Sequence, residues 1–282
     1  MDIPMITDRE LANIGQLLQK LTGIPLAPRK KHLVVGRLNK RLRHYGLSNY
    51  TQYFELVSDR NHEEEMQVMV DLLTTNETYF FREPVHFEFL SNTVLPELRS
   101  QALVRAWSAA SSSGEEAYSL AMVMRETLGA RSWEILGSDI NLDVLDTASR
   151  GIYPFDRVRG LPTENLHTHC LKGVRTQEGT FSIKPELKDR VKFRQINLNE
   201  PLPDIGTFDI IMLRNVLIYF DIDTKQQIVA RVLQALKPGG YFFISHAETL
   251  HNISTAVKMI KPSIFRKSDS AQISKGTGAP CP

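Results

Sequence analysis

The sequence predicts a doubly wound α/β domain that carries a small inserted β segment and follows an all-α domain. From Val104 onward, short apolar segments alternate with segments of helical periodicity, which is the pattern of a parallel sheet covered by helices. Upstream of Val104 the periodicity is helical only. Within the alternating part, the stretch from Gly151 to Lys188 far exceeds the roughly 2 to 6 residues of an ordinary helix-to-strand connection, so we expect an insert there.

Length and composition indicate two folding units and exclude several classes of protein. The 282 residues exceed the roughly 150 of a typical domain, and 42% hydrophobic with 23% charged residues argues against an intrinsically disordered chain. No segment approaches the ~18 apolar residues of a membrane span, and the first residues lack the features of a secretory signal. We therefore expect a cytoplasmic protein without membrane insertion. Two cysteines, Cys170 and Cys281, are too few for a disulfide framework.

The all-α part is predicted to contain four helices. Thr7 and Glu10 have the spacing of a capping box, and apolar residues then recur at helical spacing until Gly23. Methionines in the last helix belong to an apolar stripe, which we assign to the core. The three further helices are expected at residues 30–45, 49–57 and 63–73.

The second predicted helix lies in a strongly basic stretch. Between Leu11 and Phe54 there is no Asp or Glu, although the formal net charge of the whole chain is only +2. A solvated helix face and a surface for an acidic partner both explain such a run, and the missing acids favour the partner. The basic residues of this stretch are Lys20, Arg29, Lys30, Lys31, Arg37, Lys40, Arg41 and Arg43.

A connector of unusual content joins the helical part to the alternating part. It runs from Thr74 to Leu90 and has the sequence TTNETYFFREPVHFEFL, in which a polar run gives way to aromatic residues and then to Arg82. We expect the aromatic side chains to seal the junction between the two parts. The polar residues before them are candidates for a binding site.

The alternating part predicts the order of strands and helices that a doubly wound sheet requires. In such a sheet, ligands bind beyond the carboxyl ends of the strands, so the residues just after each strand are candidate site residues. Strands are expected at 103–107, 133–137, 191–196, 208–213 and 241–245 with a last one near Ile264 and Phe265, and helices at 114–128, 142–149 and 224–236.

The first two strand ends favour a nucleoside cofactor without phosphates. The loop SAASSSGEE has one glycine and lacks the G-x-G-x-x-G of a dinucleotide site, which disfavours NAD. Asp139 lies 25 residues beyond Gly114, where an acid binds ribose hydroxyls or, equally well, caps a helix. Glu115 and Glu116 are also good first-turn residues of a helix. Together the three acids suit a cationic ligand such as S-adenosylmethionine (SAM), which carries a sulfonium and no phosphate.

The later strand ends add polar residues to the same edge of the sheet. Asn197 and Leu198 can give an adenine one polar and one apolar contact, although Asn is also a common turn residue. Arg214, Asn215 and Tyr219 lie in RNVLIYF, which lacks the Asn/Asp-Pro-Pro-Tyr of methylases that act on exocyclic base nitrogens. We expect the KPGG that follows the last helix to form a tight turn.

The insert allows two interpretations. Its segment TFSIKPEL has the weak alternation of an exposed β ribbon whose edge accepts a peptide strand, and a decorated loop explains it equally well. His167, His169 and Cys170 lie together, but they have no partner pair at zinc spacing, so we expect no metal site.

The motifs TTNETYFFRE, WSAASSSGEEAYS, GSDIN, INLNE, LRNVLIYF and LKPGG, in this order behind a basic helical module, give the chain a specific resemblance. From about Thr7 to Lys267 it closely resembles the CheR family of chemotaxis receptor methyltransferases. The resemblance implies a Rossmann-like class I SAM-dependent methyltransferase domain at 91–267, with the insert at about 151–190. The helical domain would then span 1–75, the connector 76–90 and a disordered tail 268–282.

The resemblance also implies an activity and its residues. Members of the family transfer a methyl group from SAM to glutamate side chains on the cytoplasmic helices of chemoreceptors, which yields glutamyl methyl esters for sensory adaptation and S-adenosylhomocysteine. In some members the insert docks a pentapeptide at the receptor C-terminus. Arg82 and Tyr219 would be the catalytic residues. The implied cofactor-binding residues are Asn76, Thr78, Arg82, Glu116, Asp139, Asn197, Leu198, Arg214 and Asn215. The implied receptor-binding residues are Arg37 and Arg43, helped by Lys40 and Arg41.

Two alternatives stay open on the sequence. The first is a SAM-dependent methyltransferase with another acceptor, such as RNA or a small molecule. The basic stretch has no stacking aromatic residues interleaved with it apart from Tyr45 and Tyr50, so we expect no nucleic-acid partner. The second is a non-catalytic scaffold that senses SAM, against which the presence of Arg82 and Tyr219 argues.

Overall fold

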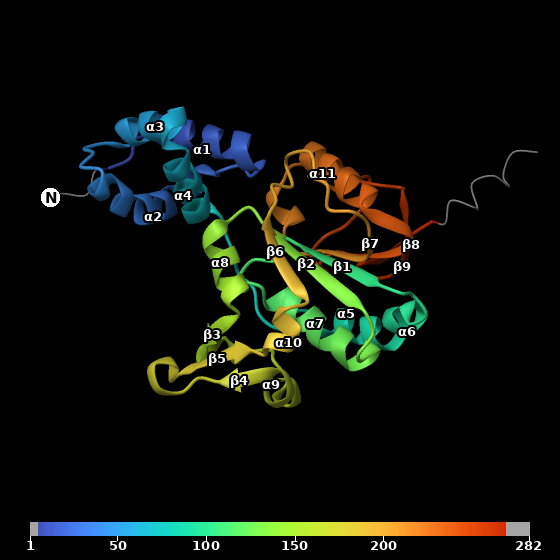
Figure 1. Ribbon diagram of the computed structural model, residues 1–282. Coiled ribbons are helices and arrows are strands. Elements are labelled where there is room, and N and C mark those ends of the chain that lie inside the picture. The colour runs from blue at the N-terminus through green and yellow to red at the C-terminus, as the bar shows by residue number, and fades with distance from the viewer. Residues whose placement is uncertain (1–4, 269–282) are drawn as a thin grey trace, which may run out of the picture.

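The computed structural model describes residues 5–268, in which a helical domain, an α/β domain and a small insert are arranged as Figure 1 shows. The predicted tail 269–282 lies outside the described residues. No helix of residues 5–268 has the length and apolar character needed to cross a membrane. The fold class predicted from the sequence is confirmed, with the corrections given below.

The helical domain contains the four predicted helices: α1 (Asp8–Thr22), α2 (Lys31–His44), α3 (Tyr50–Ser58) and α4 (Glu63–Leu73). The predicted capping box is present, because the Thr7 hydroxyl accepts from the Glu10 backbone N–H and the Thr7 backbone N–H donates to the Glu10 carboxylate. Gly23, at a φ of +78°, ends α1. Apolar side chains of all four helices form one core, and Met69 is buried in it as expected.

Three short helical segments, which the sequence analysis did not predict, occupy the end of the connector and the residues directly after it. They are α5 (Pro84–Phe89), a π-helical turn at Leu90–Val94 and α6 (Leu95–Leu98). Proline stands at the start of α5 and again at the start of α6, where its missing N–H costs nothing. Phe80, Phe87 and Phe89 are buried in the core of the α/β domain, in a cluster that contains no residue of the helical domain. The aromatic residues therefore anchor the connector to the α/β domain and do not seal the junction between the two parts, which corrects the prediction.

The main sheet contains β1 (Val104–Ala109), β2 (Trp133–Asp139), β6 (Val191–Gln195), β7 (Phe208–Leu213), β8 (Leu236–Phe243), β9 (Val257–Lys261) and β10 (Ile264–Lys267). Their order is β6-β2-β1-β7-β8-β10-β9, and β10 pairs antiparallel with both its neighbours. The parallel strands β2 and β7 flank β1, so the strand order reverses at β1. The carboxyl ends of these three strands therefore form the crevice in which doubly wound sheets bind their ligands.

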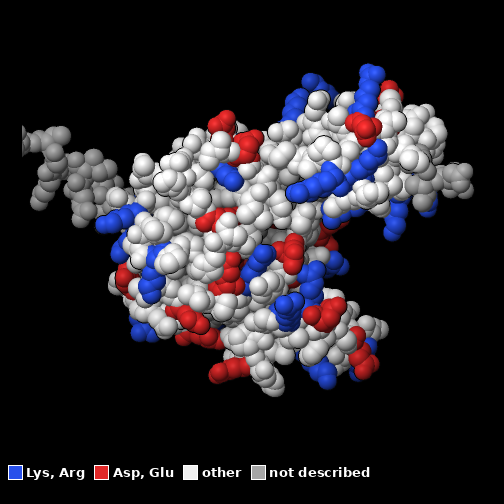
Figure 2. All heavy atoms as spheres, turned by 180° about the vertical axis from the view of Figure 1, so that it is seen from behind, with Lys and Arg blue, Asp and Glu red and all other residues white. Residues whose placement is uncertain are grey.

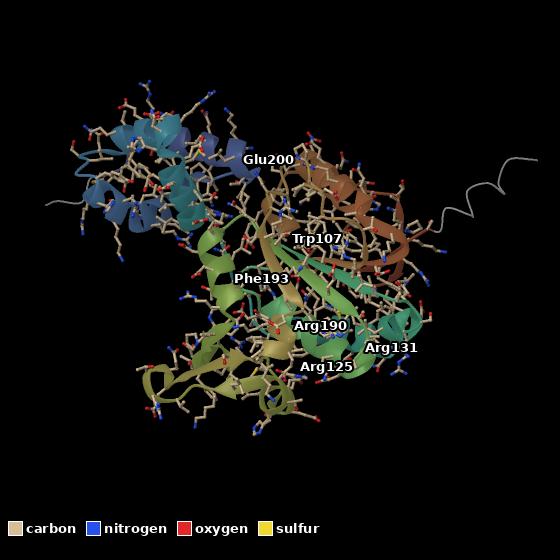
Figure 3. All side chains as sticks on the ribbon, viewed as in Figure 1. Trp107, Arg125, Arg131, Arg190, Phe193 and Glu200 are labelled. Atoms are coloured by element: carbon tan, nitrogen blue, oxygen red, sulfur yellow. The ribbon has the colours of Figure 1, made fainter. Side chains whose placement is uncertain are left out.

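Helices cover both faces of this sheet. α7 (Glu115–Leu128) packs with α5 and α6 on one face, and α11 (Ile222–Gln234) packs on the other (Figure 1). Successive side chains of β1 point to opposite faces of the sheet: Ala106 belongs to the core on the α7 side, and Trp107, labelled in Figure 3, belongs to the core on the α11 side. A further helix, α8 (Leu142–Arg150), is separated from the end of β2 by two residues. Phe193 of β6 fills the space over Gly137, where a Cβ would lie 2.4 Å from its ring.

Three details of the sheet differ from the sequence prediction. Asp139 is the last residue of β2 and does not follow it. KPGG is part of β8, and no separate tight turn precedes that strand, because Leu236 already pairs with Phe208 and the register shifts before Tyr241. β9 was not predicted, since Val257 is its one buried residue and no alternation marks the strand.

The insert folds as a three-stranded antiparallel sheet with a helix on it, and the β interpretation is confirmed over the decorated loop. Its elements are β3 (Ile152–Pro154), α9 (Thr163–His169), β4 (Cys170–Lys172), β5 (Thr180–Ile183) and α10 (Pro185–Lys188). The strand order is β3-β5-β4, so β5 pairs on both sides. The expectation that the TFSIKPEL strand offers a free edge is therefore wrong, and the edges belong to β3 and β4.

The helical domain docks on the α/β domain through polar contacts to its loops. The Asn141 amide donates to the Asp71 carbonyl (2.9 Å) and to the Thr74 hydroxyl (2.8 Å), both at the end of α4. The Asn197 amide donates to the carbonyl of Leu21 at the end of α1 (2.7 Å). Two helix ends of the helical domain thus meet two strand ends of the sheet, beside the crevice.

Candidate functional site

One pocket at the carboxyl ends of the parallel strands contains every residue predicted for the cofactor or for catalysis. The connector forms one wall of it, and the strand ends form the other. The predicted residues that line it are Asn76, Thr78, Arg82, Glu116, Asp139, Asn197, Leu198, Arg214, Asn215 and Tyr219. Sequence positions from 76 to 219 therefore converge on one site, as the topology predicts.

Asp139 presents a buried carboxylate at the end of β2. One oxygen accepts the Ser112 backbone N–H (2.9 Å) and the other accepts that of Asn141 (3.1 Å). Burial raises the pKa of Asp139, and these N–H groups oppose the rise. The loop that holds Ser112 turns sharply, and Gly114 at a φ of +95° cannot be replaced easily because a Cβ would lie 2.8 Å from Ala148. The carboxylate is thus fixed in place before any ligand arrives.

Glu116 and Arg214 form a buried ion pair beside Asp139. The Arg214 guanidinium, with no exposed side-chain surface, donates to the Glu116 carboxylate (2.9 Å), which also accepts the Ser108 hydroxyl (2.7 Å). A second nitrogen of Arg214 contacts the Glu83 carboxylate (3.1 Å) and the carbonyl of Arg82 (2.5 Å). Burial raises the pKa of Glu116, although the Arg214 charge acts against it. Arg214 therefore connects the strand end to the connector.

Glu115 does not belong to the pocket, which corrects the prediction that three acids face the ligand. Its buried carboxylate accepts the Ser113 hydroxyl (2.7 Å) and pairs with Arg157 of the insert (2.9 Å). The carboxylates that do line the pocket are those of Glu77, Glu116 and Asp139.

An apolar wall lies at the end of the pocket nearest the helical domain. Leu198 is part of it, together with side chains that the sequence analysis missed: Ile24, Ile140, Ile196, Val216 and Phe220. Asn197 is committed to the fold, because its amide donates to Leu21 and its oxygen accepts the Asn199 N–H (3.0 Å). This wall is apolar and can pack against a purine ring, and Asn197 connects it to α1.

Arg82 and Tyr219 lie at the mouth of the pocket and are half-buried. Arg82 donates to the Glu77 carbonyl (2.8 Å), and its guanidinium lies over the Tyr79 ring. Burial raises the pKa of Tyr219, against the opposing effect of the Arg82 charge, so its hydroxyl keeps its proton at neutral pH. Both side chains can donate hydrogen bonds to an anion that enters the mouth.

Two acids that position the site were missed by the sequence analysis. Glu248 accepts backbone N–H groups from Asn215 (3.1 Å), Leu217 (2.8 Å) and Ser245 (2.7 Å), and Asn215 has a φ of +59°. Glu83 accepts the Ser245 hydroxyl (2.9 Å) in addition to its contact with Arg214. Glu83 stands inside the quoted motif TTNETYFFRE, which was its only signal, and no motif included Glu248.

The four residues of α2 that were predicted to meet the receptor differ in their surroundings. Arg37 donates to the carbonyls of Leu72 (2.7 Å) and Thr74 (2.8 Å) at the end of α4. Arg41 pairs with Glu65, whose carboxylate also accepts the Tyr53 hydroxyl. Lys40 and Arg43 are exposed. None of the four lines the pocket.

The residues present fit SAM. Asp139 offers a buried carboxylate, and Glu116 a carboxylate whose side chain is 12% exposed, to hydroxyl and amino groups, and the apolar wall offers a surface for adenine. The loop after β1 has no glycine at the places where a pyrophosphate would need close backbone approach. Lys30 from the helical domain completes the lining.

Comparison with known proteins agrees with this site. Residues 76–265 match the family model "CheR methyltransferase, SAM binding domain", and residues 9–74 match "CheR methyltransferase, all-alpha domain". The chemotaxis protein methyltransferase of Escherichia coli is 38% identical over 251 residues, which cover 88% of this chain and 87% of that protein. Chemotaxis protein methyltransferase 2 of Pseudomonas aeruginosa is 38% identical over 262 residues, with 92% and 93% covered. That of Borreliella burgdorferi is 36% identical over 273 residues, with 93% and 95% covered.

The matched SAM-binding domain, which contains every pocket residue that was predicted for the cofactor or for catalysis, identifies SAM as the cofactor. The two matched domains together span residues 9–265 with a gap of one residue. The chain belongs to the CheR methyltransferase family.

Proposed function

We propose that this protein methylates glutamate side chains on the cytoplasmic helices of chemoreceptors, with SAM as the methyl donor, and that it acts in the cytoplasm. The products are glutamyl methyl esters and S-adenosylhomocysteine. The observation that carries the proposal is the convergence of Arg82 and Tyr219 with the cofactor-binding residues in one pocket. The names of the relatives support a chemotaxis methyltransferase, and the glutamate specificity is our own extension.

The pocket's own residues hold the donor. SAM, when bound, supplies a methyl group activated by a sulfonium. Asp139 binds the ribose hydroxyls and Glu116 the amino-acid part, while Leu198 and Asn197 flank the adenine. Asn76, Thr78, Arg214 and Asn215 complete these contacts. Since Asp139 and Glu116 are already held by protein partners, little ordering is needed on binding.

The acceptor side needs orientation more than acid–base chemistry. A glutamate is ionised at pH 7 and requires no base to attack. Arg82 and Tyr219 donate hydrogen bonds to its carboxylate at the pocket mouth and hold one oxygen toward the methyl group. Alignment of this kind can contribute up to ~7 to 11 kcal/mol, and exclusion of water from the carboxylate adds to it.

The basic surface of α2 attracts the acidic receptor helices. Lys40 and Arg43 are its exposed members, whereas Arg37 and Arg41 bind inside the helical domain and support the helix that carries the other two. Figure 2 shows a hollow between the lobe of the helical domain and the lobe of the insert, with basic side chains on both lobes. A receptor helix fits this hollow, and opposite charge raises its rate of association.

The insert provides a second contact, to a peptide at the receptor C-terminus. β4 is an edge strand, and an apolar groove beside it is lined by Phe155, Leu166, Leu171 and Phe181, with His167. Leu171 and Phe155 are about half exposed. An extended peptide adds a strand to such an edge through its backbone and places alternate side chains in the groove.

The test uses methyl-labelled SAM and receptor-containing membranes, and measures alkali-labile label released as methanol. We expect release by the unchanged protein and at least about tenfold less by Tyr219→Phe, with affinity for S-adenosylhomocysteine little changed. Arg82→Gln should lower release at least as much and, because Arg82 is also assigned to the cofactor, should weaken that affinity as well. Tyr45→Phe, an exposed tyrosine of the helical domain, is the matched control and should keep full activity.

Two results would contradict the proposal. Cofactor binding without methanol release on any receptor would favour the SAM-sensing scaffold. Transfer of label to RNA or to a small molecule in place of the receptor would favour a different acceptor.

A further inference from the structure

A pair of guanidinium groups shares one aromatic ring next to Arg82 of the pocket; the ring, that of Tyr79, and the second arginine, Arg159, lie outside the pocket lining. The Arg82 guanidinium carbon lies 5.6 Å from the centre of the Tyr79 ring, and that of Arg159 lies 5.9 Å from the same centre. Arg82 comes from the connector and lines the pocket, whereas Arg159 comes from the insert and is exposed. The insert thus adds a positive charge close to the place where the acceptor enters.

Arg159 is held there by the packing of its neighbours. Gly160, at a φ of +83°, lies so close to the connector that a Cβ would be 2.2 Å from the Phe80 carbonyl oxygen. Arg157 pairs with Glu115, whose side chain has no exposed surface, and Leu161 is buried. The backbone on both sides of Arg159 is therefore fixed against the α/β domain and the connector.

Neither guanidinium has a carboxylate partner within residues 5–268, in contrast to the other arginines around the site. Arg157 pairs with Glu115, and Arg214 pairs with Glu83 and Glu116. The Arg82 side chain donates only to a backbone carbonyl in the described part of the chain. A guanidinium that is oriented by an aromatic ring and has no anion of its own is prepared to bind a carboxylate from another molecule.

We propose that Arg159, together with Tyr79, binds a second carboxylate on the acceptor helix, next to the glutamate that Arg82 and Tyr219 hold for methylation. This inference rests on the proposed function and adds a specificity determinant to it. Because both guanidinium groups lie within 6 Å of one ring centre, the second acidic residue should lie within about two helical turns (roughly 11 Å) of the acceptor glutamate. The protein would then prefer acceptors that carry paired acidic residues on one helix face.

The test is a double-mutant cycle between Arg159 and the acceptor. One series of receptor segments keeps the methylated glutamate and replaces each other acidic residue within two turns by glutamine, one at a time. We expect Arg159→Gln to raise KM about fivefold or more with kcat unchanged, because the contact orients the helix and does not touch the reacting atoms. For one of the acceptor replacements, we expect the unchanged protein to show the same rise in KM that Arg159→Gln causes with the original acceptor. That replacement should then cause no further rise in KM when it is tested with Arg159→Gln.

Further variants distinguish the proposed contact of Arg159 with the acceptor from a general effect of positive charge and from an effect on folding. Arg131→Gln removes an exposed arginine just before the amino end of β2 (labelled in Figure 3), whereas the pocket lies at the carboxyl ends of the strands, and it should leave KM unchanged. Tyr79→Leu removes the ring under both guanidinium groups and should raise KM, whereas Tyr79→Phe should not.

An unchanged KM in Arg159→Gln, or additive effects with every acceptor replacement, would overturn the inference while methyl ester formation by the unchanged protein still supports the proposed function. Failure of the unchanged protein to form an ester on any segment would overturn the proposed function, and this inference with it.

Discussion

The floor and the rim of the pocket are built in opposite ways. The floor, formed by Glu116, Asp139 and Arg214, is buried, and its charged groups are bound by protein partners at 2.5 to 3.1 Å. The rim, formed by Tyr79, Arg82, Arg159 and Tyr219, is half-buried or exposed, and its arginines have no ion-pair partner within residues 5–268. The floor is acidic on balance and the rim basic.

This difference matches the two ligands that we assign to them. A cofactor of constant structure is bound best by groups that are ordered beforehand, since less conformational freedom is lost on binding. An acceptor that arrives on a large helical partner must be attracted, oriented and released in each cycle. Unpaired charges at an exposed rim serve this purpose, because they attract a carboxylate without holding it irreversibly.

The largest expected effect is on the floor. Arg214→Met leaves the buried carboxylates of Glu83 and Glu116 without their cation, and removal of one partner from a buried ion pair costs about 3–5 kcal/mol. We expect the free energy of unfolding, measured by urea titration at pH 7, to fall by that amount. Arg82→Met, on the rim, should lower it by less than about 1 kcal/mol. Equal losses in the two variants would contradict the distinction between floor and rim.

The second effect concerns cofactor affinity. Asp139→Ala removes a carboxylate that faces the pocket, and hydrogen bonds to a charged group are worth about 1.5–3 kcal/mol each. We expect S-adenosylhomocysteine to bind about 30- to 100-fold more weakly by calorimetry on folded protein. Asp139→Asn, which retains one acceptor, should show a smaller loss. Arg159→Gln is the rim control and should bind the cofactor normally; a similar loss there would argue against separate binding groups.

A third test measures how the free energy of unfolding depends on pH through His86, which contacts Glu83, a partner of Arg214 in the floor. His86 is buried between Glu83, His246 and Ser263, and burial together with the Arg214 charge lowers its pKa to about 3. A depressed histidine pKa means that the unfolded chain takes up the proton first, so stability is lost as the pH falls below 6.5. The loss should be about 1.4 kcal/mol per pH unit, or roughly 2 kcal/mol between pH 6.5 and 5.

His86→Gln should remove that contribution to the slope, as measured by urea unfolding at pH 7, 6 and 5. His251→Gln, at an exposed position, should unfold with the pH dependence of the unchanged protein. If His86→Gln kept the full slope, His86 would have to be protonated in the folded state.

The strand-end residues of the floor could be placed from the sequence because the strand ends of a doubly wound sheet must converge, so that Asp139 and Arg214 were expected at one edge without coordinates. The prediction from sequence was wrong where neighbouring side chains with the same local signal point to different parts of the molecule. Glu115 and Glu116 are neighbours with the same helix-start signal, yet one faces the insert and the other the pocket. That choice depends on Arg157 and Arg214, which are distant in sequence.

The rim was harder to predict because its members come from segments without periodicity. The position of Arg159 depends on the contact between Gly160 and the Phe80 carbonyl, and no local sequence pattern predicts that contact. β5 was similarly assigned a free edge because alternation identifies a strand but does not reveal how many neighbours it has. In the same way, the basic run of α2 predicted charge but not which arginines are bound internally.

The smallest expected effect tests this last point and separates the basic residues of α2 into two kinds. Replacing both Lys40 and Arg43 by alanine should raise the KM for receptor membranes severalfold at low salt, since exposed charges act over the Debye length of about 10 Å at 0.1 M. The difference from the unchanged protein should vanish near 1 M salt, where that length is about 3 Å, and stability should be unchanged.

Arg37→Ala should behave differently, although it removes the same charge. It leaves the Leu72 and Thr74 carbonyls without their donor, so we expect a loss of about 1–2 kcal/mol in the free energy of unfolding, independent of salt. Because Thr74 leads directly into the connector, affinity for S-adenosylhomocysteine should fall as well. A salt-dependent rise in KM with normal stability and normal cofactor affinity would instead place Arg37 on the receptor-binding surface with Lys40 and Arg43, and its observed contacts would then have to yield when the receptor binds.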